Sequence, residues 1–251
     1  MEKLALAIRG GYAFAGTLEI AHISNSRDDF MLGAITARRL PALAAGIIAI
    51  TATVTLAATS KPTRPKERVG VIERAQGEVL VERNGLTSTV TEGHAITRRD
   101  YLITGPNSRL LLSFDDGSRL AVGENALLVV ADFMREEGRR SGALILDLIR
   151  GAIRLVTAKP EIAPDKRVEV RTAAATISSQ WMDLWSGPVD DKLAVLVIQG
   201  KVDVRNDAGR VTLDRKRHAT IVSERVSAPE KPAIWSTSRT RDMLHTVAFS
   251  K

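Results

Sequence analysis

The sequence predicts an all-β fold, a solenoid or sandwich of many short strands, preceded by one apolar signal or transmembrane helix. Apolar and polar residues alternate with a period of two from Val69 onward, which is typical of half-buried strands. Turn signals interrupt this alternation about every ten residues, as they do in sandwiches and barrels. No amphipathic segment of about three helical turns intervenes, so alternating βαβ units are not expected.

Three segments share one plan, in which a glycine precedes an alternating run of Val, Ile or Leu: "GEVLVERNG" (77–85), "GAIRLVT" (151–157) and "GKVDVRNDAG" (200–209). Each glycine marks a turn that leads into a strand. Further strands are predicted in "SRLLLSF", "RVEVRTAAATIS", "KLAVLVIQ" and "RHATIVS". Two charged segments are predicted to be loops, "MREEGRRSGA" (134–143) and "APDKR" (163–167).

The amino-acid composition excludes several classes of function. The 251 residues are 44% hydrophobic but only 4% aromatic, so Val, Leu, Ile and Ala must build the core. The absence of cysteine excludes disulfides, thiolate metal sites and cysteine nucleophiles. The formal charge is +7, but the basic residues are spread along the chain, with neither a helical recognition motif nor aromatic stacking platforms. We therefore expect a mildly basic, solvated surface and no nucleic-acid partner.

The first sixty residues are predicted to contain an export or anchoring signal, the alternative being a buried helix of a soluble domain. No residue from Leu40 to Ala58 carries a charge, and Arg38 and Arg39 precede this run. A helix needs about 20 apolar residues to cross a bilayer, and a basic flank is typical of either a signal peptide or an anchor. Met31 stands where a secretory signal would begin, which makes residues 1–30 a candidate start-site artefact.

These observations divide the chain into five segments. They are a short N-terminal segment (1–39), a signal peptide or transmembrane helix (40–60), a linker (61–68), the β domain (69–226) and a C-terminal tail (227–251) that either packs through Trp235 or stays loose.

Several ordered blocks of the β domain resemble the FecR domain family, periplasmic modules of iron-dicitrate-type transmembrane regulators and other exported bacterial proteins. The central block reads T-G-x-x-S-x-x-x-L-x-F-x-D-G-S-x-L and starts at Thr104. Further matching blocks are "GEVLVERNG", "LDLIRGAIRLVT", "VEVRTAAATIS" and "AVLVIQGKVDVRNDAGRVTL". The resemblance covers about residues 69–222. It implies a right-handed, solenoid-like β stack outside the cytoplasmic membrane.

The chain also departs from the family pattern. The family's G-x-R-G-T stretch is replaced by "SSQWMDLW" around Trp181, and its last Pro-Gly turn by the basic "DRKRH" (214–218). Full-length regulators of this kind carry a cytoplasmic domain that engages a sigma factor and a C-terminal signalling domain. Residues 1–39 and the tail are expected to be too short for such domains.

No catalytic, cofactor or metal site is predicted. The four histidines are isolated in the sequence, whereas a metal site needs convergent ligands. Asp115 and Asp116 stand before Gly117, which is a strong hairpin signal. We expect the two carboxylates to face apart at a tight, solvated corner.

Two groups of residues are candidates for binding a partner. Trp181 and Trp185 stand four apart and are either a shared binding face or core residues. The basic cluster of Arg215, Lys216 and Arg217 is either an anion-binding patch or a solvated turn.

Together these observations predict a non-enzymatic, exported or membrane-anchored FecR-domain protein, located in the periplasm or on the inner membrane with its β domain on the periplasmic side. It would act as an envelope sensing or interaction module whose partner is an envelope protein or a glycan. Residues 40–60 would hold it to the membrane if they are not cleaved. The alternative is a transmembrane regulator of sigma-factor-dependent, iron-type transport genes.

Overall fold

The computed structural model describes residues 68–135, 142–158 and 166–250. The predicted N-terminal segment, apolar helix and nearly all of the linker lie outside the described residues, as do residues 136–141 and 163–165 of the two predicted loops. Within the described part of the chain, no helix is both long and apolar enough to cross a membrane.

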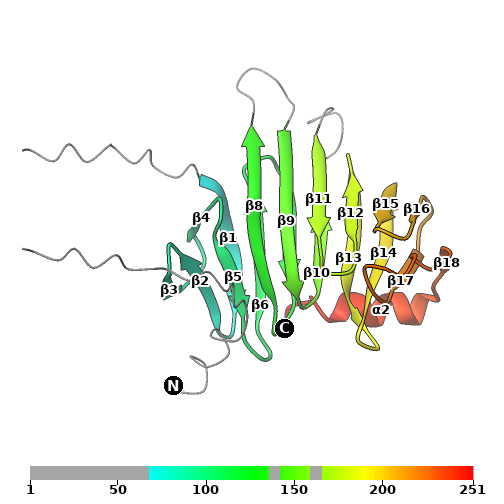
Figure 1. The fold of residues 1–251 in the computed structure, drawn as a ribbon. Coiled ribbons are helices and arrows are strands. Elements are labelled where there is room, and N and C mark those ends of the chain that lie inside the picture. Colours follow the sequence, from blue (N-terminus) through cyan, green and yellow to red (C-terminus); the bar gives the residue numbers. More distant parts are fainter. Residues whose placement is uncertain (1–67, 136–141, 159–165, 251) are drawn as a thin grey trace, which may run out of the picture. The chain divides into compact units, whose positions relative to one another are not determined.

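Two nine-stranded sheets form the described part of the chain, which confirms the all-β prediction (Figure 1). Sheet A contains, in spatial order, β18 (Ala233–Ile234), β17 (His218–Val222), β14 (Lys192–Gly200), β13 (Met182–Val189), β10 (Ile153–Val156), β7 (Arg119–Val122), β6 (Arg109–Phe114), β1 (Arg68–Gln76) and β4 (Ala95–Thr97). Sheet B contains β16 (Arg210–Leu213), β15 (Val202–Arg205), β12 (Thr176–Ser179), β11 (Arg167–Arg171), β9 (Gly142–Arg150), β8 (Leu127–Arg135), β5 (Tyr101–Thr104), β2 (Val79–Arg83) and β3 (Leu86–Thr89).

Spatial order follows chain order in both sheets, apart from the strands at the β1 and β2 end. The chain passes back and forth between the sheets and adds strands to each in turn, which agrees with a stacked arrangement. Strand neighbours are antiparallel, with the exception of β9 and β11, which are parallel. Short turns suffice for antiparallel neighbours, and this explains the frequent turn signals in the sequence.

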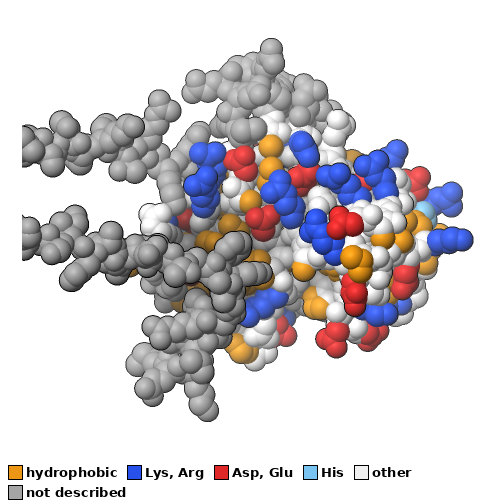
Figure 2. Space-filling view, viewed as in Figure 1, with side chains coloured by type: hydrophobic (Ala, Val, Ile, Leu, Met, Phe, Trp, Pro, Cys, Tyr) orange, Lys and Arg blue, Asp and Glu red, His pale blue; other side chains and the backbone are white. Residues whose placement is uncertain are grey.

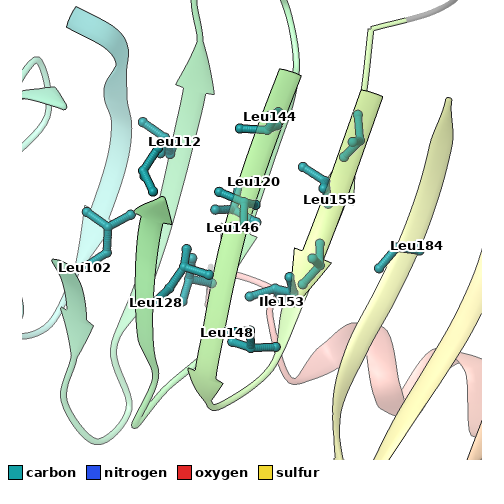
Figure 3. Close-up of a cluster of buried hydrophobic side chains, with 14 of the residues drawn as sticks. Leu102, Leu112, Leu120, Leu128, Leu144, Leu146, Leu148, Ile153, Leu155 and Leu184 are labelled. Carbon is teal, nitrogen blue, oxygen red and sulfur yellow. The ribbon is translucent and has the colours of Figure 1, made fainter. Parts of the chain in front are cut away.

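The main core lies where the inward faces of the two sheets meet. Strand β6 shows the rule, since Leu110, Leu112 and Phe114 are buried while the residues between them are half-exposed. Leu102 of β5 and Leu146 of β9 belong to the same cluster (Figure 3). Each such leucine stabilises the fold by about 2 kcal/mol, so aliphatic side chains provide the core that composition predicted.

The C-terminal segment packs against the outer face of sheet A. It forms β18 and then α2 (Thr237–His245), which lies across the strands of this sheet (Figure 1). The side chain of Ser236 caps α2 by accepting a hydrogen bond from the Arg239 backbone N–H. Of the two alternatives predicted for residues 227–251, the structure shows packing through Trp235, which is buried. A second hydrophobic cluster results, formed by Ala152, Trp185, Ala194, Leu196, Ala219, Trp235 and Val247.

Gly123 permits the close approach of this C-terminal segment. A Cβ atom at Gly123 would lie 2.7 Å from the backbone oxygen of Thr246 and 3.3 Å from that of Ala152. Any larger residue would push the segment away from the sheet.

Candidate functional site

The aspartate corner is a turn, as predicted, and its two carboxylates have different partners. Gly117 has a φ of 86° and closes the turn between β6 and β7. Asp115 accepts hydrogen bonds from Nε and Nη2 of Arg68 at 3.2 and 3.0 Å. Asp116 accepts the Ser118 backbone N–H at 2.8 Å and forms an ion pair with Lys166. The corner is less solvated than the sequence suggested, because only 17% of the Asp116 side chain is exposed.

Lys166 is the buried charge that the sequence analysis missed. Its side chain is 3% exposed, and Nζ donates a 2.5 Å hydrogen bond to Oγ of Ser118. Burial lowers the pKa of Lys166, while the charge and hydrogen bond of Asp116 oppose this shift. Ser118 is itself fully buried and also accepts the Ala158 backbone N–H. Because Ser118 is fully buried, its hydroxyl is not accessible to a substrate in this arrangement.

The two tryptophans do not share an exposed face. Trp185 is fully buried, and its indole Nε1 donates to Thr246 Oγ1 at 2.9 Å. Of the two alternatives left open by the sequence, Trp185 therefore fits that of a core residue. Trp181 is half-exposed, and its indole N–H has no partner among the described residues. Only Trp181 has a surface from which it can contact a ligand.

The predicted basic cluster lies in the turn between β16 and β17. Arg215 and Lys216 are exposed, whereas Arg217 is half-buried and donates from Nη1 to Thr237 Oγ1 at 2.8 Å. Its hydrogen bond to Thr237 joins the turn to the C-terminal segment. Arg217 also adopts a φ of 65° within this turn. None of the three lines the surface groove to which Trp181 belongs.

The described residues include no group of three or more His, Cys, Asp or Glu side chains that could hold a metal ion. Asp190 and Asp191 form the turn between β13 and β14, with φ values of 49° and 60°. Both are exposed. The left-handed region that they occupy is one that Asp tolerates, which explains this acidic pair as a turn.

A surface groove of about 660 Å³ is lined by chemically varied groups. It lies at one end of β11, β12 and β15, next to the half-exposed Trp181. Cations, hydroxyls, an amide and a carboxylate line it together with this indole: Lys166, Arg167, Ser178, Ser179, Gln180, Lys201 and Asp203. Convergent polar groups beside an aromatic ring are typical of ligand sites.

Glu169 fixes the arginines beside this groove. Its side chain is 3% exposed and lies between Arg167 and Arg171, with which it forms ion pairs. Burial alone would raise the pKa of Glu169, but the hydrogen bonds and charges of the two arginines outweigh it and hold that pKa below its ordinary value. The outward face of β11 is thus a preorganised row of charge.

A comparison with family models identifies part of the chain. Residues 100–203 match the family described as FecR protein. The match bears out the resemblance to the FecR family over this part of the chain. The match includes the aspartate corner, Lys166 and Trp181, whereas the resemblance seen in the sequence extended further, over about 69–222.

Solved structures give weaker likenesses. Two crystal structures of a "putative anti-sigma factor from Parabacteroides distasonis" each have a TM-score of 0.46 and 15% identity. Each covers 57% of this chain, and the chain spans 64% and 63% of their lengths. A structure described as a "cell surface anchoring domain" has a TM-score of 0.26 and 24% identity, with 26% of this chain and 88% of the other covered. No curated protein matches the chain.

Proposed function

We propose that this protein is a non-enzymatic regulatory module of the bacterial envelope, in which the FecR domain senses a ligand or partner outside the cytoplasmic membrane. The FecR match at residues 100–203 is the observation that carries this proposal. The charge-free run from Leu40 to Ala58, with its basic flank, supports export or anchoring.

The groove beside Trp181 is the proposed sensing surface. It combines an unpartnered indole N–H with Lys201, which makes no ion pair in the described part of the chain. The buried network of Lys166, Asp116 and Ser118 holds the start of β11 at the edge of this groove. Such a rigid support favours ligand recognition, since little side-chain order has to be gained on binding.

Fractionation of the native cells with intact-mass analysis tests this proposal. We expect the protein in the membrane or periplasmic fraction, either at full mass or shortened by cleavage near the end of the 40–58 run. Recovery of an uncleaved chain from the cytoplasm would contradict the proposal.

A transmembrane regulator of a sigma factor is the second candidate, and the FecR match favours it as well. This role requires that the 40–60 segment stays uncleaved and that residues 1–39 hold a partner in the cytoplasm. Co-purification of a sigma factor with the full chain, lost when residues 1–39 are deleted, would support this candidate. A mature protein that starts after residue 60 would exclude it.

A further inference from the structure

A row of arginines crosses the outer face of sheet B. Arg171 of β11 lies opposite Thr176 of β12, which lies opposite Arg205 of β15, which in turn lies opposite Arg210 of β16. Neighbouring strands are about 4.8 Å apart, so the row places cationic groups at regular steps perpendicular to the strands. Figure 2 shows Lys and Arg side chains gathered over this side of the sheet.

The inner end of the row has an acidic partner and the outer end has none. Arg171 is paired with Glu169. Arg205 and Arg210 are exposed and directly opposite each other, and neither side chain has an ion pair or hydrogen bond within the described residues. Like charges directly opposite across two strands destabilise the pair. An anion bound between the two guanidinium groups would remove this repulsion.

Two hollows adjoin the row on the same face. Arg205 lines a depression of about 190 Å³ together with Thr176 and Arg225. The groove beside Trp181 lies further along β12 and β15, where Ser178 is opposite Asp203. The carboxylate of Asp203 accepts a 2.6 Å hydrogen bond from Thr212 Oγ1. The face therefore offers cations in a line, and beside them hydroxyls, a carboxylate and an aromatic ring.

We propose that the outer face of β11, β12, β15 and β16 binds an acidic polysaccharide. This ligand is a linear sugar chain in which at least one of every few sugar units carries a carboxylate. Its chain would lie across the strands, with carboxylates on Arg205 and Arg210. Guanidinium groups match carboxylates in bidentate geometry, and a sugar residue has a length similar to the spacing between strands.

Other polyanions fit this face less well. Single-stranded nucleic acids bind to several successive aromatic platforms, whereas Trp181 is the one aromatic side chain among the residues that line the two hollows. Membrane surfaces are bound by cations combined with exposed apolar side chains that enter the lipid. None of the large apolar residues that are exposed in the described part of the chain belongs to β11, β12, β15 or β16.

This proposal rests on the proposed function and names its ligand class. Direct binding can be measured whether or not the chain regulates a sigma factor, so the two proposals can fail separately. Calorimetric titration of the full chain, in detergent, with oligogalacturonate tests it. We expect saturable, salt-sensitive binding to the acidic oligomer and none to maltopentaose. The double variant Arg205→Gln/Arg210→Gln should weaken binding at least tenfold, because each lost charge-assisted contact corresponds to about tenfold in affinity.

The variant Arg215→Gln/Lys216→Gln is the matched control, since it removes two exposed charges from the turn between β16 and β17. It should bind as the parent does. The Arg205/Arg210 variant should keep or raise the melting temperature because it relieves repulsion, so that weaker binding cannot be attributed to unfolding. The proposal is overturned if oligogalacturonate does not bind, if both double variants lose affinity equally, or if single-stranded DNA or phosphatidylglycerol vesicles bind more tightly through the same arginines.

Discussion

The indole Nε1 of Trp185 in β13 donates a 2.9 Å hydrogen bond to Oγ1 of Thr246, which lies 61 residues further along the chain. Further contacts continue towards β1, where the guanidinium of Arg74 lies 4.5 Å from the centre of the Phe249 ring. The C-terminal segment thus contacts both β13 and β1 of sheet A, and it is an integral part of the β fold.

Thr246→Val should lower the free energy of unfolding by about 1–2 kcal/mol, because the buried indole N–H loses its acceptor. Thr240→Val provides the control on the same helix. Oγ1 of Thr240 is buried without a hydrogen-bond partner among the described residues, so its replacement should be neutral or stabilising. Urea unfolding measures both. Equal losses in the two variants would show that the Trp185–Thr246 bond does not stabilise the fold.

Asp116→Asn should destabilise the protein by about 3 kcal/mol, because it leaves the charge of Lys166 buried without its partner. The amide can still accept the Ser118 N–H, so the turn itself is kept. The double variant Asp116→Asn/Lys166→Met removes the charge as well and should regain most of the loss. Unfolding free energies of the three proteins decide the point, and a double variant no more stable than Asp116→Asn would refute this account of Lys166.

Asp100→Ala should cost about 3–5 kcal/mol. The Asp100 side chain is fully buried and accepts hydrogen bonds from Nε and Nη2 of Arg83 at 2.8 and 2.7 Å, and from the Thr97 backbone N–H at 2.7 Å. Asp207→Ala breaks the exposed pair with Arg225 instead and should change stability by no more than about 0.5 kcal/mol. Thermal melts of the two variants measure the difference. Equal shifts in melting temperature would contradict the assignment of Asp100 as a buried, paired charge.

Glu169 should make stability depend on pH at the acidic end. Its pKa is lower in the folded protein than the ordinary value of 4.5, so the unfolded chain binds a proton more readily. The stabilisation is fully present above about pH 5 and is lost as the pH falls through the folded pKa. In Glu169→Gln this loss should be absent, so the stability difference between parent and variant should shrink as the pH falls. A difference that stays constant with pH would contradict the assignment.

Much of the fold is visible in the sequence because strand periodicity and turn chemistry are local. The Asn84-Gly85 pair is a local turn signal that the sequence shows directly, and both residues have positive φ values, 54° and 78°, between β2 and β3. The same holds for the corner at Gly117. The facing arginines could also have been found, since Asn206 to Gly209 reads as a turn that pairs Arg205 with Arg210.

Long-range packing explains what the sequence did not show. Lys166 stands in a short polar segment that reads as a loop, and only the tertiary fold places it on Asp116, which precedes it by fifty residues. The apolar positions of sheet A do not reveal which of its faces is covered. The burial of Trp185 therefore depends on α2, a short helix without a single buried residue and hence with a weak sequence signal.

The absence of cysteine allows a direct test of the central claim, that the β domain lies outside the cytoplasmic membrane. Ser88 in β3 is exposed, and Ser88→Cys would give the protein a single reactive thiol. We predict that a membrane-impermeant maleimide labels this variant in whole cells with a permeabilised outer membrane as completely as after lysis. Labelling that occurs only after lysis would place the β domain in the cytoplasm and contradict the account.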